Sequence, residues 1–480
     1  MPDTHFGPSR AAIMLPSSIL FLSGTILLSL NLVRPLGYAI SDWLYLGSLA
    51  FALLETLTVD RRNFSCWING KLLLAAGAIT AGSLLSMTRS VHVRVALVET
   101  VQLLYVLTLF MSLVWIMIRR GHIGGIAAAF IVSGTFAASV ALVDYLAGTQ
   151  FGATLSGEAA RQLWGRYAGP LGHPNKLGYF LVLTAALTLP MALSTQRRLV
   201  ALVLAGSLWV QVAGIYLSGS VTAYLGLVLT VVVMLVASGA WRRRLAGLAA
   251  SALLLLALVS YMVGSNPARG LQTIAASIRG DADRVSTITY DARLNLYRLA
   301  ASRIWENPFV GAGFDQFSTS GLGDAYRLLP GTVHNVFLQG LYSGGLLVLL
   351  GWLVFYFYLV HAAVKTLIKA RELQALLVGL AASAFALVLM DQFQDAIYQR
   401  EKWLVAGLLL GAVWVSKPGR EASRPPASAP GSDAEALSRR EQAMQEASST
   451  LPICIRQRRR RSPHFRDPCR GMSGRHRETA

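Results

Sequence analysis

Three polar clusters in an otherwise apolar sequence combine residue types that bind anions and accept protons. The first joins Arg166 to His173-Pro174-Asn175-Lys176, the second contains Arg293, and the third is His334-Asn335. A guanidinium binds phosphate through paired hydrogen bonds, and an imidazole accepts a proton near its ordinary pKa of about 6.5. The clusters are therefore suited to binding a phosphate group, and His334 could accept a proton.

Each cluster also has a plainer interpretation. Pro174 fits the first turn of a helix, whose N-terminus attracts phosphate when Lys176 is nearby, but the same residues suit an ordinary loop capped by Asn175. Arg293 could serve only to anchor a helix at a membrane surface, and a lone histidine is more often structural than catalytic. His334 gains weight because it precedes a predicted helix on the same side of the membrane as the two arginines.

The elements that must position these clusters are membrane helices. Of the 480 residues, 54% are hydrophobic and 14% are charged, whereas an average protein carries about 25% charged residues. This composition excludes a soluble globular enzyme and predicts an all-α, polytopic membrane protein of about 12 transmembrane helices. The predicted spans cover residues 12–33, 36–58, 71–88, 94–117, 123–147, 177–195, 199–217, 220–240, 246–264, 335–360, 373–392 and 402–416.

Lys and Arg concentrate in alternate loops between these spans, which orients the chain by the positive-inside rule. The basic loops include Arg61-Arg62, Arg119-Arg120, Arg197-Arg198 and Arg242-Arg243-Arg244. With these loops inside, both termini are cytoplasmic. Two long loops, about 148–176 and 265–334, then face outward, and all three polar clusters lie in them or at their ends.

The larger outer loop contains a helical pattern. Its apolar residues recur at helical spacing before Asn307-Pro308, and they are Tyr290, Leu294, Tyr297, Ala301, Ile304 and Trp305. The spacing predicts an amphipathic helix along the outer membrane-water boundary, with Arg293 beside its apolar stripe.

Charge and cysteine content exclude two further classes of function. The net charge of +19 is spread along the chain, as expected where Lys and Arg meet anionic lipids, so no nucleic-acid partner is expected. The three cysteines show no metal-binding or disulfide spacing. We expect residues 1–416 to form the membrane domain and residues 417–480, rich in Pro, Ser and Arg, to form a disordered basic cytoplasmic tail.

The order of the motifs resembles the O-antigen ligase and polymerase superfamily. The resemblance lies in Arg166 with Pro174-Asn175, in Arg293 followed by Trp305-Glu306-Asn307-Pro308 through Gly313, and in His334-Asn335 with Leu338-Gln339. Ser41-Asp42 and Tyr398-Gln399-Arg400 with Trp403 resemble it as well, so the likeness extends over about residues 15–415.

The resemblance implies a C-type glycosyltransferase-like enzyme of the bacterial inner membrane, active at the periplasmic face. Such an enzyme moves a glycan from a polyprenyl diphosphate carrier to a sugar hydroxyl of a glycan or lipid A-core acceptor, without a cofactor or metal. The resemblance also implies that Arg166 and Arg293 bind the diphosphate and that His334 is the base of an inverting displacement. His173, Lys176 and Asn335 are possible neighbours, and membrane lipids and other polysaccharide-assembly proteins are possible partners.

One departure from the family pattern bears on the type of enzyme. Many members carry a Ser-Arg pair where this chain reads Leu217-Ser218-Gly219-Ser220, which implies either a different cation in that place or a weaker site. The Ser-x-Ser-x-Thr pattern here favours a polymerase of exopolysaccharide or O-antigen repeat units over a lipopolysaccharide O-antigen ligase.

Two other classes of function remain open. A transporter or flippase for a polyprenyl-linked substrate would need a path of charged residues buried within helices. A scaffold would recruit assembly proteins through its basic tail, and its outer Arg and His residues would be replaceable.

Overall fold

The computed structural model describes residues 15–30, 39–58, 70–156, 166–237, 284–313, 333–368, 375–394 and 396–415. These ranges form helices and contain no strand. The chain divides into two units, Met1–Lys417 and Pro418–Ala480, and all described residues belong to the first. The predicted span 246–264 and the predicted tail 417–480 lie outside the described residues.

The helices follow the apolar segments of the sequence, and eleven of the twelve predicted spans coincide with described helices. In chain order the α-helices are α1 (Pro16–Ile26), α2 (Ile40–Thr58), α3 (Gly70–Ser86), α4 (Val93–Leu104), α5 (Met111–Arg119), α6 (Ile123–Ala147), α7 (Phe151–Ser156), α8 (Pro174–Ser194), α9 (Arg198–Ser218), α10 (Val221–Ala237), α13 (Arg284–Ile304), α15 (Val336–Ile368), α16 (Ala375–Met390) and α17 (Arg400–Val415). Short 3-10 turns occur at Leu27–Ser29, Met87–Arg89 and Gly169–Leu171, and a π-helical turn, Tyr105–Phe110, joins α4 to α5.

Six of these helical stretches are long and apolar enough to cross a membrane. They are Leu72–Arg89, Val93–Arg119, Ile123–Ala147, Pro174–Ser194, Arg198–Ser218 and Val336–Ile368. Three shorter apolar helices, Pro16–Ser29, Val221–Ala237 and Ala375–Met390, add to them. The chain is therefore a helical membrane protein by length and composition, while the count of about 12 spans and the outward orientation of the long loops remain predictions.

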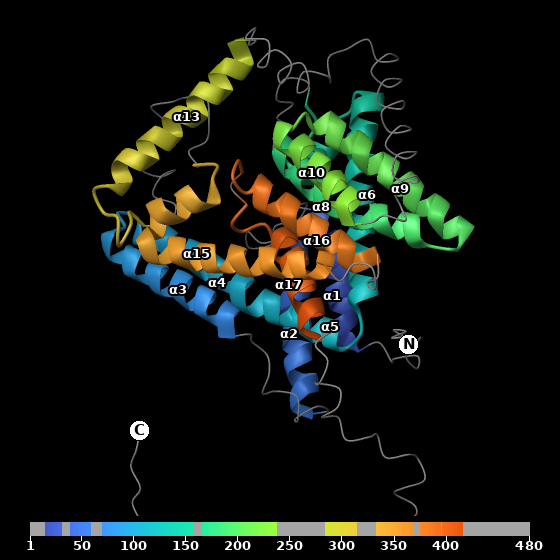
Figure 1. Cartoon of the computed structure of the whole chain (residues 1–480), viewed down its shortest axis with the longest axis horizontal. Helices are drawn as coiled ribbons and strands as arrows, with labels where there is room; N and C mark the ends of the chain where they lie inside the picture. Colours follow the sequence, from blue (N-terminus) through green and yellow to red (C-terminus); the bar gives the residue numbers. More distant parts are fainter. Residues whose placement is uncertain are drawn as a thin grey trace, which may run out of the picture. The chain divides into compact units, whose positions relative to one another are not determined.

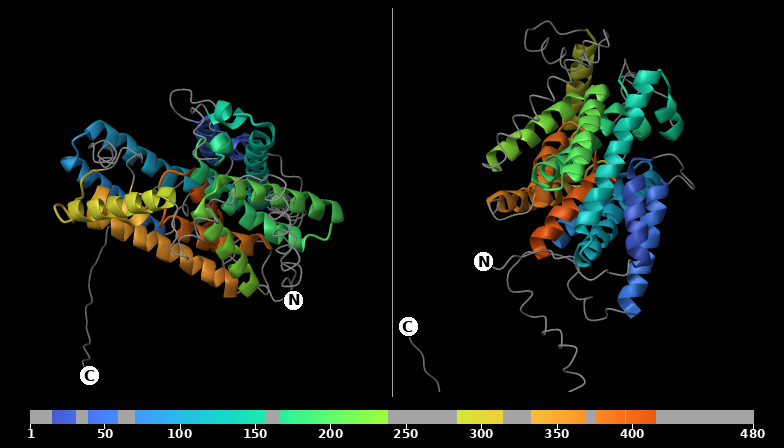
Figure 2. Two further views of the ribbon diagram at one scale, coloured as in Figure 1. Left: turned by 90° about the horizontal axis from the view of Figure 1, so that it is seen from above. Right: turned by 90° about the vertical axis from the view of Figure 1, so that its right-hand side faces the viewer.

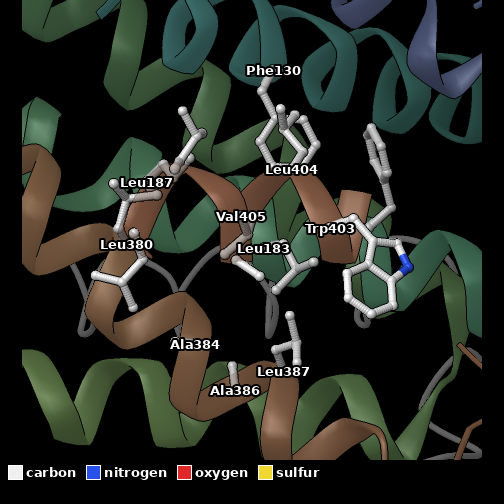
Figure 3. Packing of buried hydrophobic residues seen from close by; sticks show 14 of the residues in the cluster. Phe130, Leu183, Leu187, Leu380, Ala384, Ala386, Leu387, Trp403, Leu404 and Val405 are labelled. Carbon is white, nitrogen blue, oxygen red and sulfur yellow. The ribbon is translucent and has the colours of Figure 1, made fainter. Parts of the chain in front are cut away.

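Helix α8 lies inside the helix bundle, in contact with α6, α9, α10 and α16 (Figure 1). Its residues are apolar on every side, and such a helix is stable only when it is surrounded by other helices. Figure 3 shows Leu183 and Leu187 of α8 packed with Leu380 and Leu387 of α16 and with Leu404 of α17. This core fixes α8 against α16 and α17, whose ends carry polar residues of the site.

Helix α15 breaks near its start, at Gly345, where φ is 68° and ψ is −167°. The segment that follows α13 pairs with this break: the Ala312 N–H donates to the Tyr342 carbonyl (2.8 Å) and the Gly313 N–H to the Ser343 carbonyl (2.9 Å). In return, the Leu346 N–H donates to the Pro308 carbonyl (2.9 Å). Main-chain groups that the break removes from the helix thus find partners in the 308–313 segment.

Helix α13 packs against α15. The two helices overlap in direction when seen from above (Figure 2, left), whereas in Figure 1 α13 rises away from α15. Among the α13 side chains that the structure describes, from Arg293 onward, Leu296 and Ala300 are fully buried, and they join Tyr342 of α15 in a small apolar cluster. The prediction of a helix in this loop is confirmed. The buried face of the helix does not coincide with the predicted apolar stripe, because Ala301 and Trp305 of that stripe are exposed. Arg293 shares the face of Leu296 and Ala300, because residues three to four apart lie on one side of a helix.

Candidate functional site

Arg166 lies just before α8 and is held by main-chain and side-chain acceptors. Its Nε donates to the Ser218 carbonyl at the end of α9 (2.7 Å), and its Nη2 donates to Oδ1 of Asn175. The side chain passes over Gly219, where an added Cβ would lie 3.1 Å from Cγ of Arg166. These contacts fix the guanidinium stem while leaving further N–H donors on the group.

His173 is the N-cap of α8, and Pro174 is the first helical residue. The His173 imidazole Nδ1 accepts a hydrogen bond from the Asn175 N–H (3.1 Å). The interpretation of Asn175 as the cap is therefore wrong: the histidine caps the helix, and the Asn175 side chain turns to Arg166. Lys176 lies exposed on the same turn, where its charge acts on Glu401 of α17.

His334 precedes α15, as predicted, and has a left-handed backbone with φ of 52°. No other non-glycine residue in the described ranges has a positive φ. Asn335 caps the helix, because its Oδ1 accepts from the Leu338 N–H (2.9 Å). Such strained conformations persist where surrounding contacts enforce them, and they concentrate at functional sites.

Helix α13 supplies one of the contacts that hold this strained residue. The Tyr297 hydroxyl lies 3.3 Å from the His334 carbonyl and 3.4 Å from the Gln392 carbonyl, within hydrogen-bonding distance of both. Arg293 stands one helical turn before Tyr297 on the same face of α13. The contact that supports the His334 backbone therefore also keeps Arg293 close to it.

Charge interactions link four of the predicted residues to one another, with Arg293 in the centre. Burial, followed by the positive charges of Arg293 and His173, lowers the pKa of His334 to about 4. Burial also lowers the pKa of Arg166 to about 10; Tyr224 opposes this shift and Arg293 adds to it. Arg293 is itself desolvated, which lowers its pKa. Arg293 thus acts on both Arg166 and His334, and His173 acts on His334.

The arrangement suits an anion better than a cation. Two largely buried guanidinium groups and two imidazoles meet beside the N-terminus of α8, whose dipole also favours negative charge. Within the described part of the chain, no three His, Cys, Asp or Glu side chains gather as a metal site. An anionic ligand would relieve the repulsion between the arginines and replace part of their lost hydration.

The chain carries no arginine at the end of α9, where the resemblance implies one. Gly219 there leaves room for the side chain of Arg166, which comes from the segment before α8. Arg166 is itself one of the two predicted diphosphate ligands, so it adds no cation in place of the missing one. A different cation and a weaker site both remain predictions.

Several residues of the site were missed from the sequence. The sequence suggests Asn175 as a cap and as part of a motif, but not as a partner of Arg166, and it suggests Tyr297 only as part of an apolar stripe. Asp391 and Gln392 lie at the end of the predicted span 373–392, where the sequence assigns them no role. Arg400 and Asp42, which lie far apart in two motifs, form a two-point ion pair. Polar residues within an apolar segment are the sequence feature that could have pointed to these residues. The sequence does not reveal which partners they contact.

One part of the chain matches a known protein family. Residues 206–353 match the family model described as O-antigen ligase. The matched range begins in α9, includes Arg293 and His334, and ends in α15, whereas Arg166 and His173 precede it. No curated protein matches the chain.

Proposed function

The O-antigen ligase domain at residues 206–353 supports placing the chain in the O-antigen ligase/polymerase superfamily, and on that premise we propose that it is a membrane glycosyltransferase. Its donor is a polyprenyl-diphosphate-linked glycan, and its acceptor is a sugar hydroxyl of a glycan or of lipid A-core. The observation that carries the proposal is the effect of the Arg293 charge on both Arg166 and His334, outside the membrane-crossing helices.

The two arginines bind the diphosphate of the donor. Arg166 is fixed by Ser218 and Asn175 with donors to spare, and Arg293 faces it from α13. As the bond between the anomeric carbon and the diphosphate oxygen breaks, negative charge grows on the leaving oxygen. Guanidinium groups held in a desolvated site stabilise such charge without reorganising.

His334 accepts the proton of the acceptor hydroxyl. The acceptor oxygen forms a bond to the anomeric carbon, the electron pair of the broken bond leaves with the carrier diphosphate, and the proton passes to the imidazole. With a pKa of about 4, His334 is neutral at physiological pH and able to accept. A bound diphosphate offsets the charge of Arg293 and raises this pKa toward the working pH. The displacement is single and inverting, and no step is assigned to a metal or cofactor.

We favour a polymerase of exopolysaccharide or O-antigen repeat units over an O-antigen ligase, because of the Ser218-Gly219-Ser220 pattern. The enzyme resides in the bacterial inner membrane with both termini in the cytoplasm and the site facing the periplasm, in keeping with the basic loops. Membrane lipids and other polysaccharide-assembly proteins are its expected partners.

A deletion strain complemented with wild type or with His334→Ala tests the function. Surface polysaccharide and carrier-linked intermediates are resolved by length, and membrane levels of the protein are checked by immunoblot. His361→Ala is the control, since His361 lies exposed on α15, the helix that His334 precedes.

We expect long glycan chains with wild type and His361→Ala. Single repeat units left on the carrier by His334→Ala would identify a polymerase, and full-length chains left on the carrier would identify a ligase. Normal glycan with His334→Ala, at normal protein level, would contradict the role of the base and favour a flippase or scaffold.

A further inference from the structure

A fully buried ion pair joins the residue that follows α16 to the start of α17. The Nζ of Lys402, in the first turn of α17, is 2.8 Å from Oδ2 of Asp391, and neither side chain is exposed to solvent. The carboxylate accepts further hydrogen bonds from Tyr179 of α8 (2.9 Å) and from Tyr356 of α15. Four helices thus meet at one pair of opposite charges.

The ammonium group is enclosed by aromatic rings. Lys402 Nζ lies 4.8 Å from the ring centre of Trp352, 5.2 Å from that of Tyr356 and 5.3 Å from that of Trp403. It also donates to the Tyr356 hydroxyl (2.8 Å). Aromatic faces compensate for part of the lost hydration of a cation, yet a buried pair seldom adds stability over an apolar one of similar size. Its value must then lie in the geometry that it imposes.

The ion pair is connected to the residues beside His334 through main-chain carbonyl groups of residues 391 and 392. The Asp391 carbonyl accepts the Val336 N–H (3.0 Å), and the Gln392 carbonyl accepts Nδ2 of Asn335 (3.1 Å). The Gln392 carbonyl also lies 3.4 Å from the Tyr297 hydroxyl, which approaches the His334 carbonyl as well. Both residues that follow His334 are therefore held by the turn whose side-chain anchor is Asp391.

We propose that Lys402 and Asp391 form a positioning pair, which fixes the 391–392 turn and through it the strained backbone of His334, without touching substrate. The inference rests on the proposed function, because it assigns a support to the proposed base. Neither charge takes part in the transfer of the glycan or of the proton.

The test compares Lys402→Met, Asp391→Asn and the double variant in full-length protein reconstituted in lipid nanodiscs. Lys365→Met is the matched control, since Lys365 is exposed on α15. Glycan transfer from a carrier-linked donor gives kcat and KM. The pKa of His334 is measured separately, from the pH dependence of its modification by diethyl pyrocarbonate, resolved by peptide mass spectrometry.

Each single variant leaves one buried charge without its partner, so we expect lower membrane levels from both. The double variant leaves no uncompensated charge, and we expect it to accumulate as wild type does. Its kcat should fall on the order of tenfold or more, because a misplaced base slows transfer, while the donor KM changes less than about twofold. The pKa of His334 should rise from about 4 toward the ordinary value as the histidine leaves its buried position.

A double variant with wild-type kcat and an unchanged His334 pKa would overturn the proposal. So would a double variant that does not accumulate, since the pair would then be needed for folding and not for positioning. If His334→Ala transfers glycan normally, the proposed function fails. The titration of His334 in the double variant still decides whether the pair positions that residue.

Discussion

A Cβ atom added to Gly311 would lie 2.5 Å from the backbone nitrogen of Gly345, so the loop after α13 meets the break in α15 main chain to main chain. Both glycines also have positive φ, 77° at Gly311 and 68° at Gly345. The junction joins the helix that carries Arg293 to the helix that follows His334. Its close fit leads to the first prediction.

Gly311→Ala should separate the loop from α15 and impair the site. The new methyl group collides with main chain, and the left-handed backbone costs about 1–2 kcal/mol for an L-residue with a side chain. We expect a lower midpoint of thermal unfolding in detergent and reduced glycan transfer. Gly206→Ala in α9 is the control, because nothing lies within 4 Å of its added Cβ. Equal behaviour of the two variants would show that the junction does not hold the site.

Arg293→Ala should lower kcat/KM for the carrier-linked donor by about 10²–10³-fold, the usual effect of removing one group that stabilises transition-state charge. Arg298 lies exposed on the same helix. Arg298→Ala is therefore the control, and it should leave kcat/KM within about twofold of the wild-type value. Initial rates with purified protein measure both. If Arg293→Ala and Arg298→Ala lower kcat/KM equally, a general attraction of positive charge to anions explains the effect better than a specific contact of Arg293.

Asn175→Asp should weaken donor binding more than Asn175→Ala does. The new carboxylate would pair with Arg166, whose Nη2 already donates to Oδ1 of Asn175, and would repel the diphosphate. We expect the donor KM to rise about tenfold for the acidic variant, equivalent to about 1.4 kcal/mol of lost binding. The alanine variant removes one contact of Arg166 and should raise KM less. An acidic variant with unchanged KM would place the diphosphate away from Arg166.

The pH dependence of glycan transfer should follow His334. Its pKa is lowered to about 4 by burial, Arg293 and His173, so kcat/KM should stay level from neutral pH down to about 5 and decline below about 4. Arg293→Gln removes one cause of the low His334 pKa. That pKa should then rise, while burial keeps it below about 6.5, and the decline of kcat/KM should begin at a higher pH than in wild type. A decline that begins at the same pH in both proteins would point to another group.

The same shift makes the folded protein sensitive to acid. An unfolded histidine takes up a proton near its ordinary pKa of about 6.5, whereas His334 in the folded chain resists until about 4. Stability should therefore decrease as the pH falls from about 6.5 toward about 4, because the unfolded state binds more protons in that window.

The helices could be predicted from the sequence wherever an apolar run is clearly bounded. Helix α6 occupies the predicted residues 123–147, since Gly121 and Gly148, both with positive φ, bound the run. Helix α8 begins three residues before its predicted start, because Pro174 occupies its first turn. Helix α15 continues to Ile368, past its predicted end at residue 360, because the apolar spacing persists.

The contacts that make the site could not be predicted in the same way. A spacing of 3.6 residues tells which residues share a helix face, but not which neighbour that face meets. In α13 the predicted stripe and the buried face differ for this reason: Leu296 and Ala300 are buried against α15. The pairing of Lys402 with Asp391, and the position of Arg166 over Gly219, depend on tertiary packing that no local pattern encodes.

The repulsion between Arg166 and Arg293 has a consequence for turnover. In the donor, each phosphate of the diphosphate carries one negative charge, and the second is bound to the sugar. Once the sugar has left, the freed terminal phosphate gains further negative charge. On the proposed function, the spent carrier would match the two desolvated arginines better than the donor does, and it would compete with the next donor for the site. Sustained glycan assembly would then depend on how quickly the membrane removes spent carrier, which would couple the enzyme's output to the recycling of its lipid.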